Sequence, residues 1–477
     1  MRQVFFITLA ACLLACSEAP VETASCRQAT GVKIGEVTSS TAIIWTRLTE
    51  ETARRSDGIE LRGRPDRDAP ARDFDIRELE GSAPGAPGKI KLVYSKREDL
   101  SDPIVTEWET VLPEKDYTRK FKLKHLEPGT KYYFETHTAD SSGLLEHDPL
   151  RGSFQTAPAA EVRDEVRFTV ITGQAYRDVD DQQGFRAYDA MLDLDPHFVV
   201  PTGDTVYYDS DDPLVTNKEL ARYHWCRMYS YPKLIDFHRQ VPGYWEKDDH
   251  DSYANDNWPG LVRPYMGDFT LKQGLEVFEE QTPVSGQPYR KFRWGKLLEI
   301  WLTEGREFRS PNDMPDGPEK TIWGEKQKEW LTSTLLESDA DWRLMISPTP
   351  IVGPDRTNKA DNHANAAFEH EGSWFRLWAA KKLGDNFFTT CGDRHWQYHS
   401  VDPESGLHEF SSGPISDEHA SGSPGEDPEF HRFHKVQGGF LSVTVDTTDD
   451  QQSRITFRLH GVDGKVAYEY SATQPIG

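Results

Sequence analysis

Four acidic clusters follow or adjoin apolar runs of this chain, and their residue types suit the binding of metal ions. The clusters lie at 199–207, 248–251, 255–257 and 391–395. Carboxylates, a phenol and imidazoles at the ends of strands are suitable ligands for an oxygen-rich site that holds two cations. Because such cations bind ester oxygens and activate water, the clusters indicate chemistry on an anionic ester.

Asp204 is the candidate for a carboxylate that bridges two cations. It follows the apolar run 198–201 and Gly203, so its side chain leaves a strand end with little steric hindrance. Tyr207 comes three residues later and can reach the same side after the turn. A phenolate ligand implies a hard, trivalent metal, because a divalent ion seldom lowers the pKa of a phenol enough. A Gly-Asp pair alone usually marks a turn, so the prediction depends on the four clusters occurring together.

Further candidates come from the other three clusters. His250 places a proton donor within the carboxylates of 248–251, which disfavours a merely solvated acidic loop. Asn255 adds a neutral oxygen that suits a metal or a substrate contact. Asp393 and His395 follow another strand-like run, and their alternate spacing can place both side chains on one side.

The region 165–477 is predicted to be an α/β layered domain that positions these clusters. Apolar strands alternate with amphipathic helices, and an antiparallel pair closes the series. The expected strands are 168–172, 198–201, 297–302, 342–346, 387–390, 440–445 and 455–460, and the expected helices are 185–194 and 324–336. Ligands bind at the carboxyl ends of strands in such domains, which is where the clusters lie.

Residues 27–158 are predicted to form an all-β domain. Short runs of β-forming residues recur, and a Pro-Gly turn at 128–129 precedes an aromatic strand. These spacings favour a β-sandwich of the immunoglobulin or fibronectin type. The segment from about 50 to 87, rich in Arg, Asp, Gly and Pro, is expected to be a long loop, and 157–160 the linker.

Residues 1–26 are predicted to be a lipoprotein signal and tether. The apolar run 4–15 is too short for a mature membrane-spanning helix, and it ends at Ala15 and Cys16. Cleavage before Cys16 would leave a lipidated cysteine, so we expect an exported protein anchored in the cell envelope, at the outer membrane or in the periplasm. An ordinary signal peptide cut nearby is the alternative. No other membrane contact is expected.

The net charge of −24 and the pI near 5.1 argue against nucleic-acid binding, because an acidic surface repels phosphates. The expected partner is instead a small-molecule or oligosaccharide anionic ester. Cys226 is a less favoured ligand candidate. The segments 361–365 and 411–419 fit either a pocket for a sugar or bulky ester, or a hydrogen-bonded loop.

The order and spacing of these motifs resemble the PhoD-like alkaline phosphatase and phosphodiesterase family of the metallophosphoesterase superfamily. The matching segments are 31–35, 45–48, 127–133, 195–198, 203–207, 248–251, 255–256, 324–331 and 392–395, and they span nearly all of the mature chain. The resemblance implies a layered metallophosphoesterase-type β-sandwich flanked by helices, which follows the β-rich N-terminal domain.

The resemblance also implies a metal-ligand set. Asp204 would bridge two metals, and Tyr207 and His395 would bind the first, an iron(III)-like ion. Asp249 and Asp393 would bind the second, a divalent ion that is often calcium in this family.

The resemblance assigns further roles to three residues. His250 would protonate the leaving oxygen or steady the transferring phosphoryl group, and Asn255 would contact metal or substrate. Arg306, or its neighbour Arg309, would clamp the anion, and a surface ion pair is the alternative for both. The implied activity is an exported, metal-dependent phosphatase or phosphodiesterase.

Three departures from the family pattern bear on the metals and the reaction. Gly173 stands where the family has a cysteine ligand, so the first metal would lose a ligand unless Gln174 or water replaces it. Lys247 replaces a tryptophan, and 303–306 replaces an Asp-Thr-Arg sequence. A single divalent ion is therefore an alternative to the iron and calcium pair. A metal-dependent lyase, dehydratase or sulfatase acting on an acidic polysaccharide is the alternative reaction.

Overall fold

The computed structural model describes residues 27–68, 72, 75–143 and 147–476. The predicted lipoprotein signal with Cys16 lies outside these described residues. Within them, no helix combines the length and the apolar character that crossing a bilayer requires.

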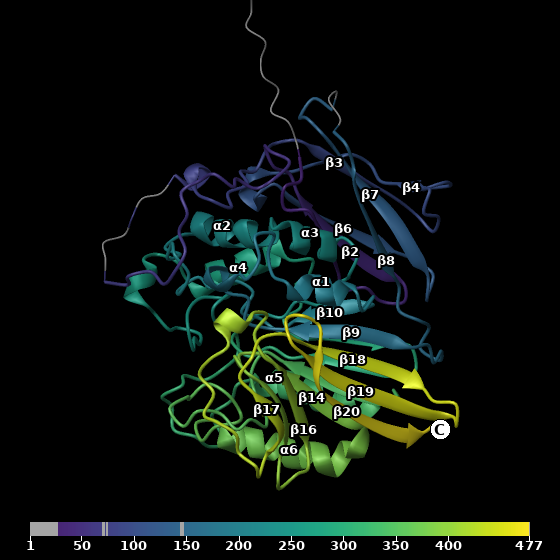
Figure 1. Cartoon of the computed structure of the whole chain (residues 1–477), viewed down its shortest axis with the longest axis vertical. Helices are drawn as coiled ribbons and strands as arrows, with labels where there is room; N and C mark the ends of the chain where they lie inside the picture. The colour runs from purple at the N-terminus through teal and green to yellow at the C-terminus, as the bar shows by residue number, and fades with distance from the viewer. Residues whose placement is uncertain (1–26, 69–71, 73–74, 144–146, 477) are drawn as a thin grey trace, which may run out of the picture.

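The N-terminal domain is a sandwich of two antiparallel sheets, as the sequence predicted (Figure 1). One sheet has the order β1 (Val32–Gly35), β2 (Thr41–Arg47), β6 (Thr118–Lys124). The other has the order β4 (Ile104–Val105), β3 (Lys89–Ser95), β7 (Lys131–Ala139), β8 (Leu150–Gln155), and β5 (Glu109–Thr110) also pairs with β3. Alternate residues such as Ile44 and Leu92 fill the core between the sheets.

The second domain is built on two further sheets that pack face to face. The five-stranded sheet has the order β10 (Phe198–Pro201), β9 (Val166–Ile171), β18 (Phe440–Thr447), β19 (Gln452–His460), β20 (Val466–Pro475). The seven-stranded sheet has the order β11 (Arg290–Trp294), β12 (Leu298–Leu302), β13 (Trp342–Ser347), β14 (Phe387–Cys391), β16 (His408–Ser412), β15 (Gln397–Val401), β17 (His431–Lys435). Phe168 and Val170 face the core between the sheets, while Ile171 packs on the opposite side.

Helices cover the outer faces of both sheets. The helices α1 (Ala187–Leu192), α2 (Lys218–Tyr229), α3 (Pro232–His238) and α4 (Leu271–Gln281) lie between the five-stranded sheet and the N-terminal domain (Figure 1). The helices α5 (Gly324–Glu337) and α6 (Glu369–Leu383) pack on the seven-stranded sheet. Short 3-10 turns are η1 (Ile76–Glu78), η2 (Pro113–Lys115), η3 (Tyr176–Asp178), η4 (Pro264–Met266), η5 (Gly384–Asn386) and η6 (Asp417–His419). The layered sandwich expected from the sequence is therefore confirmed, although α2, α3, α4 and α6 were not predicted.

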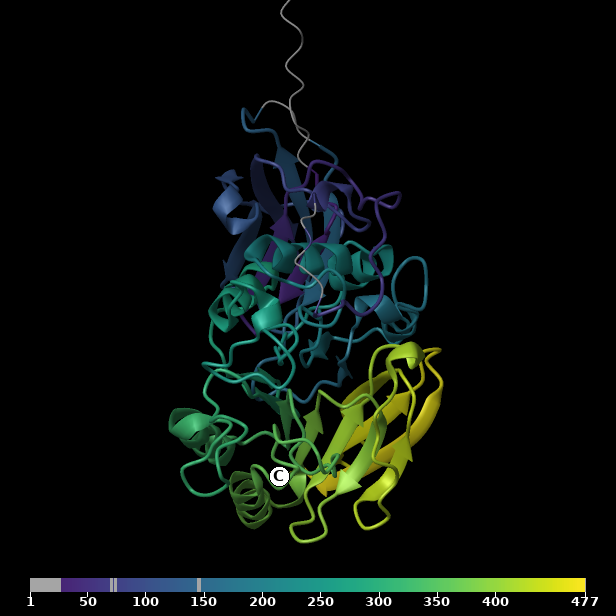
Figure 2. The same cartoon turned by 90° about the vertical axis from the view of Figure 1, so that its left-hand side faces the viewer.

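The segment that precedes the second acidic cluster joins the two domains. Gly243 forms parallel bridges with Gly35 of β1 and with Val199 of β10. Figure 2 shows the resulting arrangement, with the N-terminal strands and α2 to α4 on one side and the C-terminal strands on the other. β9 and β10 form a parallel pair, and the N–H of Asp393 after β14 donates to Thr172 Oγ1 after β9, so the carboxyl ends of these three strands meet.

Candidate active site

Asp204 leaves the carboxyl end of β10 through a turn in which two residues have positive φ. Gly203 has φ 93°, and a Cβ there would lie 2.5 Å from the backbone nitrogen of Asp248. Asp204 follows with φ 54° and is 1% exposed. Its Oδ1 has no hydrogen-bond partner among the described residues. Burial raises the pKa of Asp204 to about 8, and the charge of His250 opposes this shift while those of Asp249 and Asp251 add to it.

Tyr207 brings a phenol against Asp204 and two imidazoles. Its hydroxyl oxygen lies 3.3 Å from Asp204 Oδ2, 3.3 Å from His395 Nε2 and 2.8 Å from His419 Nε2. His395 Nε2 is also 4.0 Å from Asp204 Oδ2. The structure thus places together the three residues that were expected at the first metal, and adds His419.

The second acidic cluster is held beside the first by a carboxylate. The segment 243–246 runs parallel to β10, so the chain after it emerges next to Asp204. Asp251 is fully buried and accepts the N–H of Asp248 through Oδ1 at 2.7 Å and the N–H of Thr205 through Oδ2 at 3.1 Å. Asp251 therefore fastens the two acidic loops to each other.

Three buried carboxylates from different loops converge at this point. Oxygen atoms of Asp204, Asp248 and Asp393 lie within 4.8 Å of one another. Asp248 Oδ2, like Asp204 Oδ1, has no hydrogen-bond partner in the described part of the chain. Asp249, the predicted ligand, instead accepts backbone N–H groups with both oxygens, from His250 at 2.7 Å and from Asp256 at 2.6 Å. An oxygen of Asp249 still lies within 4.8 Å of Asp204, so Asp249 remains a candidate ligand. Asp248 is a further candidate that the sequence did not predict.

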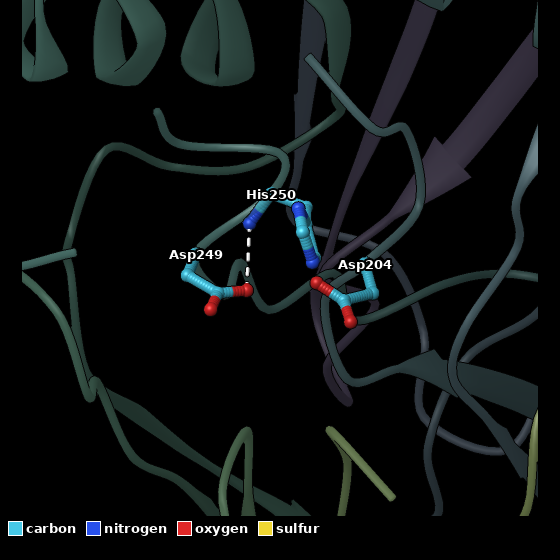
Figure 3. A group of neighbouring side chains, drawn as sticks. All are labelled: Asp204, Asp249 and His250. Atoms are coloured by element: carbon cyan, nitrogen blue, oxygen red, sulfur yellow. Dashed lines mark hydrogen bonds between the residues drawn. The ribbon is translucent and has the colours of Figure 1, made fainter. Parts of the chain in front are cut away.

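His250 is oriented by a carboxylate that the sequence analysis did not single out. Its Nδ1 lies 2.5 Å from Asp209 Oδ1, and its ring packs 4.4 Å from that of Tyr207. Figure 3 shows the imidazole directed toward the carboxylate of Asp204, with the backbone N–H of His250 bonded to Asp249. Burial alone would lower the pKa of His250, but Asp209, Asp249 and Asp204 outweigh it and raise the pKa to about 10. The carboxylates around His250 thus favour its protonated form in the metal-free chain.

Asp393 and His395 reach the site from the other sheet. Asp393 has φ 61° just beyond β14, and its N–H donates to Thr172 Oγ1 at 3.3 Å at the end of β9. Gly392 is required there because a Cβ would come within 2.6 Å of Thr202 Oγ1. Arg394 forms an ion pair with the Asp393 carboxylate.

A cavity of about 800 Å³ opens over these residues, and six basic side chains line it. They are Arg64, Arg67, Arg177, Arg263, Arg356 and Lys359. Asn255 lines the same cavity, and its N–H donates to Asp209 Oδ2 at 3.1 Å. In a chain with net charge −24, this concentration of cations suits an anionic ligand.

Arg306 lies beneath the acidic loops instead of in the cavity. It is fully buried, and its Nε donates to Asp248 Oδ1 at 2.5 Å. Its Nη2 lies 3.4 Å from Asp361 Oδ2 and 3.6 Å from Asp249 Oδ2. Arg309 is also buried. Neither arginine is therefore a surface ion pair, and the placement of Arg306 fits the positioning of carboxylates better than the expected clamping of substrate.

The structure shows what surrounds Gly173 and Gln174, where the family has a cysteine ligand followed by glutamine. The side-chain oxygen of Gln174 accepts the hydroxyl of Tyr188 at 2.6 Å, so this oxygen is already engaged in the core. A Cβ at Gly173 would lie 3.3 Å from Cδ2 of His419. The space beside Gly173 is thus taken by an imidazole from a distant part of the chain.

The segment 361–365 is a buried, hydrogen-bonded loop, and it does not line the cavity. His363 Nε2 lies 2.9 Å from Glu371 Oε2, and the N–H of Ile322 donates to the same carboxylate at 2.6 Å. Burial would raise the pKa of Glu371, but these hydrogen bonds and that of Thr321 lower it to about 2. This loop therefore supports the site from behind.

Cys226 lies apart from the candidate site. It is buried in α2 with its sulfur 4.0 Å from Asp116 Oδ2 of the N-terminal domain, and it does not line the cavity. Burial raises the pKa of this thiol to about 12, which disfavours the thiolate that binds metals.

Comparison with known proteins identifies the family. The model of the PhoD-like phosphatase matches residues 168–446, and that of the PhoD-like phosphatase N-terminal domain matches 15–158. This chain belongs to the PhoD-like phosphatase family. Alkaline phosphatase D of Bacillus subtilis (strain 168) is 22% identical over 357 residues, which cover 66% of this chain and 54% of that relative. The chain therefore spans about half the length of this curated relative.

Two solved structures share the fold of this PhoD-like chain. A structure of PhoD has a TM-score of 0.70 at 18% identity and covers 96% of this chain and 90% of its own. The purple acid phosphatase PPD1 from yellow lupin (Lupinus luteus) seeds has a TM-score of 0.59 at 12% identity. The match covers 92% of this chain and 73% of PPD1. These likenesses support the metallophosphoesterase-type fold, and the acidic groups in the site are compatible with metal binding.

Proposed function

We propose that this PhoD-like chain is an exported, metal-dependent phosphatase or phosphodiesterase that hydrolyses phosphate esters. The observation that carries the proposal is the convergence of Asp204, Tyr207, Asp248, Asp393 and His395 beside one cavity with a basic lining. The family and the fold support a phosphoric ester as the substrate.

The residues present fit metal ions. Asp204 and Asp248 each keep a buried oxygen without a partner, next to the carboxylate of Asp393. Burying like charges together is costly unless cations compensate them. Asp204, Tyr207 and His395 would hold one cation, and Asp204, Asp248, Asp249 and Asp393 a second, with iron and calcium as the pair that the resemblance suggests. Cations bound there would act as Lewis acids toward the ester and acidify water.

The chain's own residues supply the remaining chemistry. His250 is held by Asp209 through Nδ1, and the surrounding carboxylates favour its protonated form, so it would donate a proton to the leaving oxygen or to a phosphoryl oxygen. Arg356 and Lys359 at the cavity wall would attract and orient the anion. Asn255 would contact the substrate from the loop that follows His250.

Export and lipid anchoring belong to the same proposal. Their support is the apolar run 4–15 with Ala15 and Cys16, which lies outside the described residues. Labelling of cells with a radioactive fatty acid tests it, since the natural chain is expected to carry label and Cys16→Ala to lose it.

The activity is tested with p-nitrophenyl phosphate, bis(p-nitrophenyl) phosphate and acidic oligosaccharides. We expect release of inorganic phosphate or a phosphomonoester, with oxygen from isotopically labelled water in the phosphate product. An unsaturated, ultraviolet-absorbing sugar product without ester hydrolysis would instead establish the lyase alternative and overturn the proposal.

A further inference from the structure

A histidine from the far end of the chain fills the space beside Gly173. The segment before η6 runs along the end of β9, where Thr172 pairs with Pro414 in a parallel bridge. The N–H of Ile415 donates to the carbonyl of Thr172 at 3.1 Å. Gly173 has φ 60°, and a Cβ there would lie 3.3 Å from Cδ2 of His419. Pro414, whose Cβ would lie 3.0 Å from that Cβ, and His419 therefore together fill the space that a side chain at 173 would enter.

The spacing of the donor atoms around Tyr207 matches ligands of one cation. The phenol oxygen lies 2.8 Å from His419 Nε2 and 3.3 Å from both His395 Nε2 and Asp204 Oδ2. Nitrogen and oxygen ligands that bind one ion at about 2.0–2.1 Å, with angles of roughly 90° to 110°, lie about 2.9–3.4 Å apart. The three distances from the Tyr207 oxygen lie close to this range, while His395 Nε2 and Asp204 Oδ2 are 4.0 Å apart.

The orientation of His419 turns its Nε2 toward Tyr207, whose hydroxyl lies 2.8 Å away. Nδ1 lies 2.7 Å from Asp178 Oδ2, so the ring proton resides on Nδ1 and the Nε2 lone pair faces Tyr207. A carboxylate behind the ring is the usual partner of a metal-bound histidine. His419 is 5% exposed.

We propose that His419 Nε2 is a ligand of the cation bound by Asp204, Tyr207 and His395, with Asp178 as its positioning residue. The resulting set has two imidazoles, a phenol and a carboxylate, and contains no sulfur. This donor set suits a first-row transition ion such as Fe³⁺, for which Co²⁺ can serve as a spectroscopic probe, and not calcium. The inference deepens the proposed function and rests on it, because it completes the first metal site despite Gly173.

The test uses the metal-free full chain titrated with Co²⁺ alone, followed by its visible absorption and by elemental analysis. His419→Ala is expected to weaken binding at the first site by more than about 100-fold, since loss of an outer partner alone costs 10- to 100-fold. Asp178→Asn is expected to weaken metal binding at the first site by the smaller factor of about 10 to 100. Added imidazole should restore the wild-type absorption of His419→Ala by occupying the vacated position. His224→Ala removes another buried histidine, which bonds to Pro213 O, and should leave the titration unchanged.

Wild-type cobalt affinity and spectrum in His419→Ala would overturn the inference while leaving the proposed function intact. The same holds if imidazole fails to restore the spectrum of a folded His419→Ala chain. Absence of metal binding by the unchanged protein would instead defeat the proposed function, and the inference with it.

Discussion

Asp251 fastens the two acidic loops, so its replacement tests whether this connection assembles the site. Its carboxylate accepts the buried N–H groups of Asp248 and Thr205 at 2.7 and 3.1 Å. Each hydrogen bond to a charged group contributes about 1.5–3 kcal/mol. Asp251→Asn keeps one acceptor and turns an amide N–H toward the other donor. We therefore expect the free energy of unfolding to fall by about 1.5–3 kcal/mol. Asp251→Ala removes both hydrogen bonds, so the free energy of unfolding should fall by about twice as much.

Replacement of Asp251 is expected to weaken metal binding as well as to lower the stability of the fold. Asp204 and Asp248 carry the unpartnered oxygens, and each lies next to one end of this connection. The affinity of Asp251→Asn for metal should therefore fall by about 10- to 100-fold, the range for loss of a group that hydrogen-bonds to metal ligands or their loops.

The assay is urea unfolding of the metal-free chain together with metal titration, with Asp193→Asn as an exposed control. Unfolding and metal affinity of Asp251→Asn that equal those of the wild type would refute the reasoning.

Three further outcomes follow from the site. His250→Ala should lower turnover by about 10²- to 10⁴-fold with bound metal unchanged, and metal loss would make His250 a ligand instead. Arg356→Ala should raise KM roughly fivefold at constant kcat, because its side chain is 35% exposed and such a charge contributes about 1 kcal/mol to binding. The control Arg432→Ala replaces an exposed arginine and should not change KM. Equal effects of the two substitutions on KM would show that Arg356 does not bind the substrate. Glu371 has its pKa lowered from 4.5 to about 2, so it stabilises the fold above pH 4.5 by about 3 kcal/mol, and this contribution is lost as pH falls toward 2. Urea unfolding of Glu371→Gln should show a loss near that size at pH 7 and little at pH 2, and an equal loss at both would contradict the assignment.

The sequence predicted those parts of the site that lie at the ends of strands. Asp204 and Asp393 each follow a short apolar run, and in the structure each leaves a strand end with positive φ. The strand 198–201 has the predicted bounds, because Phe-Val-Val-Pro is apolar throughout and its fourth residue precedes a turn.

Other parts depend on contacts between distant segments, which no local pattern reveals. Asp209 became recognisable only when the fold placed it against His250. His419 lies in the segment 411–419 that was a pocket candidate, but only the fold shows its contact with Tyr207. Asp248 and Asp249 are adjacent, so only the backbone direction shows which one keeps a free oxygen. Helix α2 buries His224 and Arg227 between two domains, and this polar interior hides the amphipathic pattern that would have predicted it.

Elemental analysis of the purified chain and of Asp204→Ala, combined with ester hydrolysis on the same samples, tests the central claim most directly. The account predicts bound metal and phosphate release in the unchanged protein, and loss of both in Asp204→Ala. An active protein without metal, or full turnover in Asp204→Ala, would contradict it.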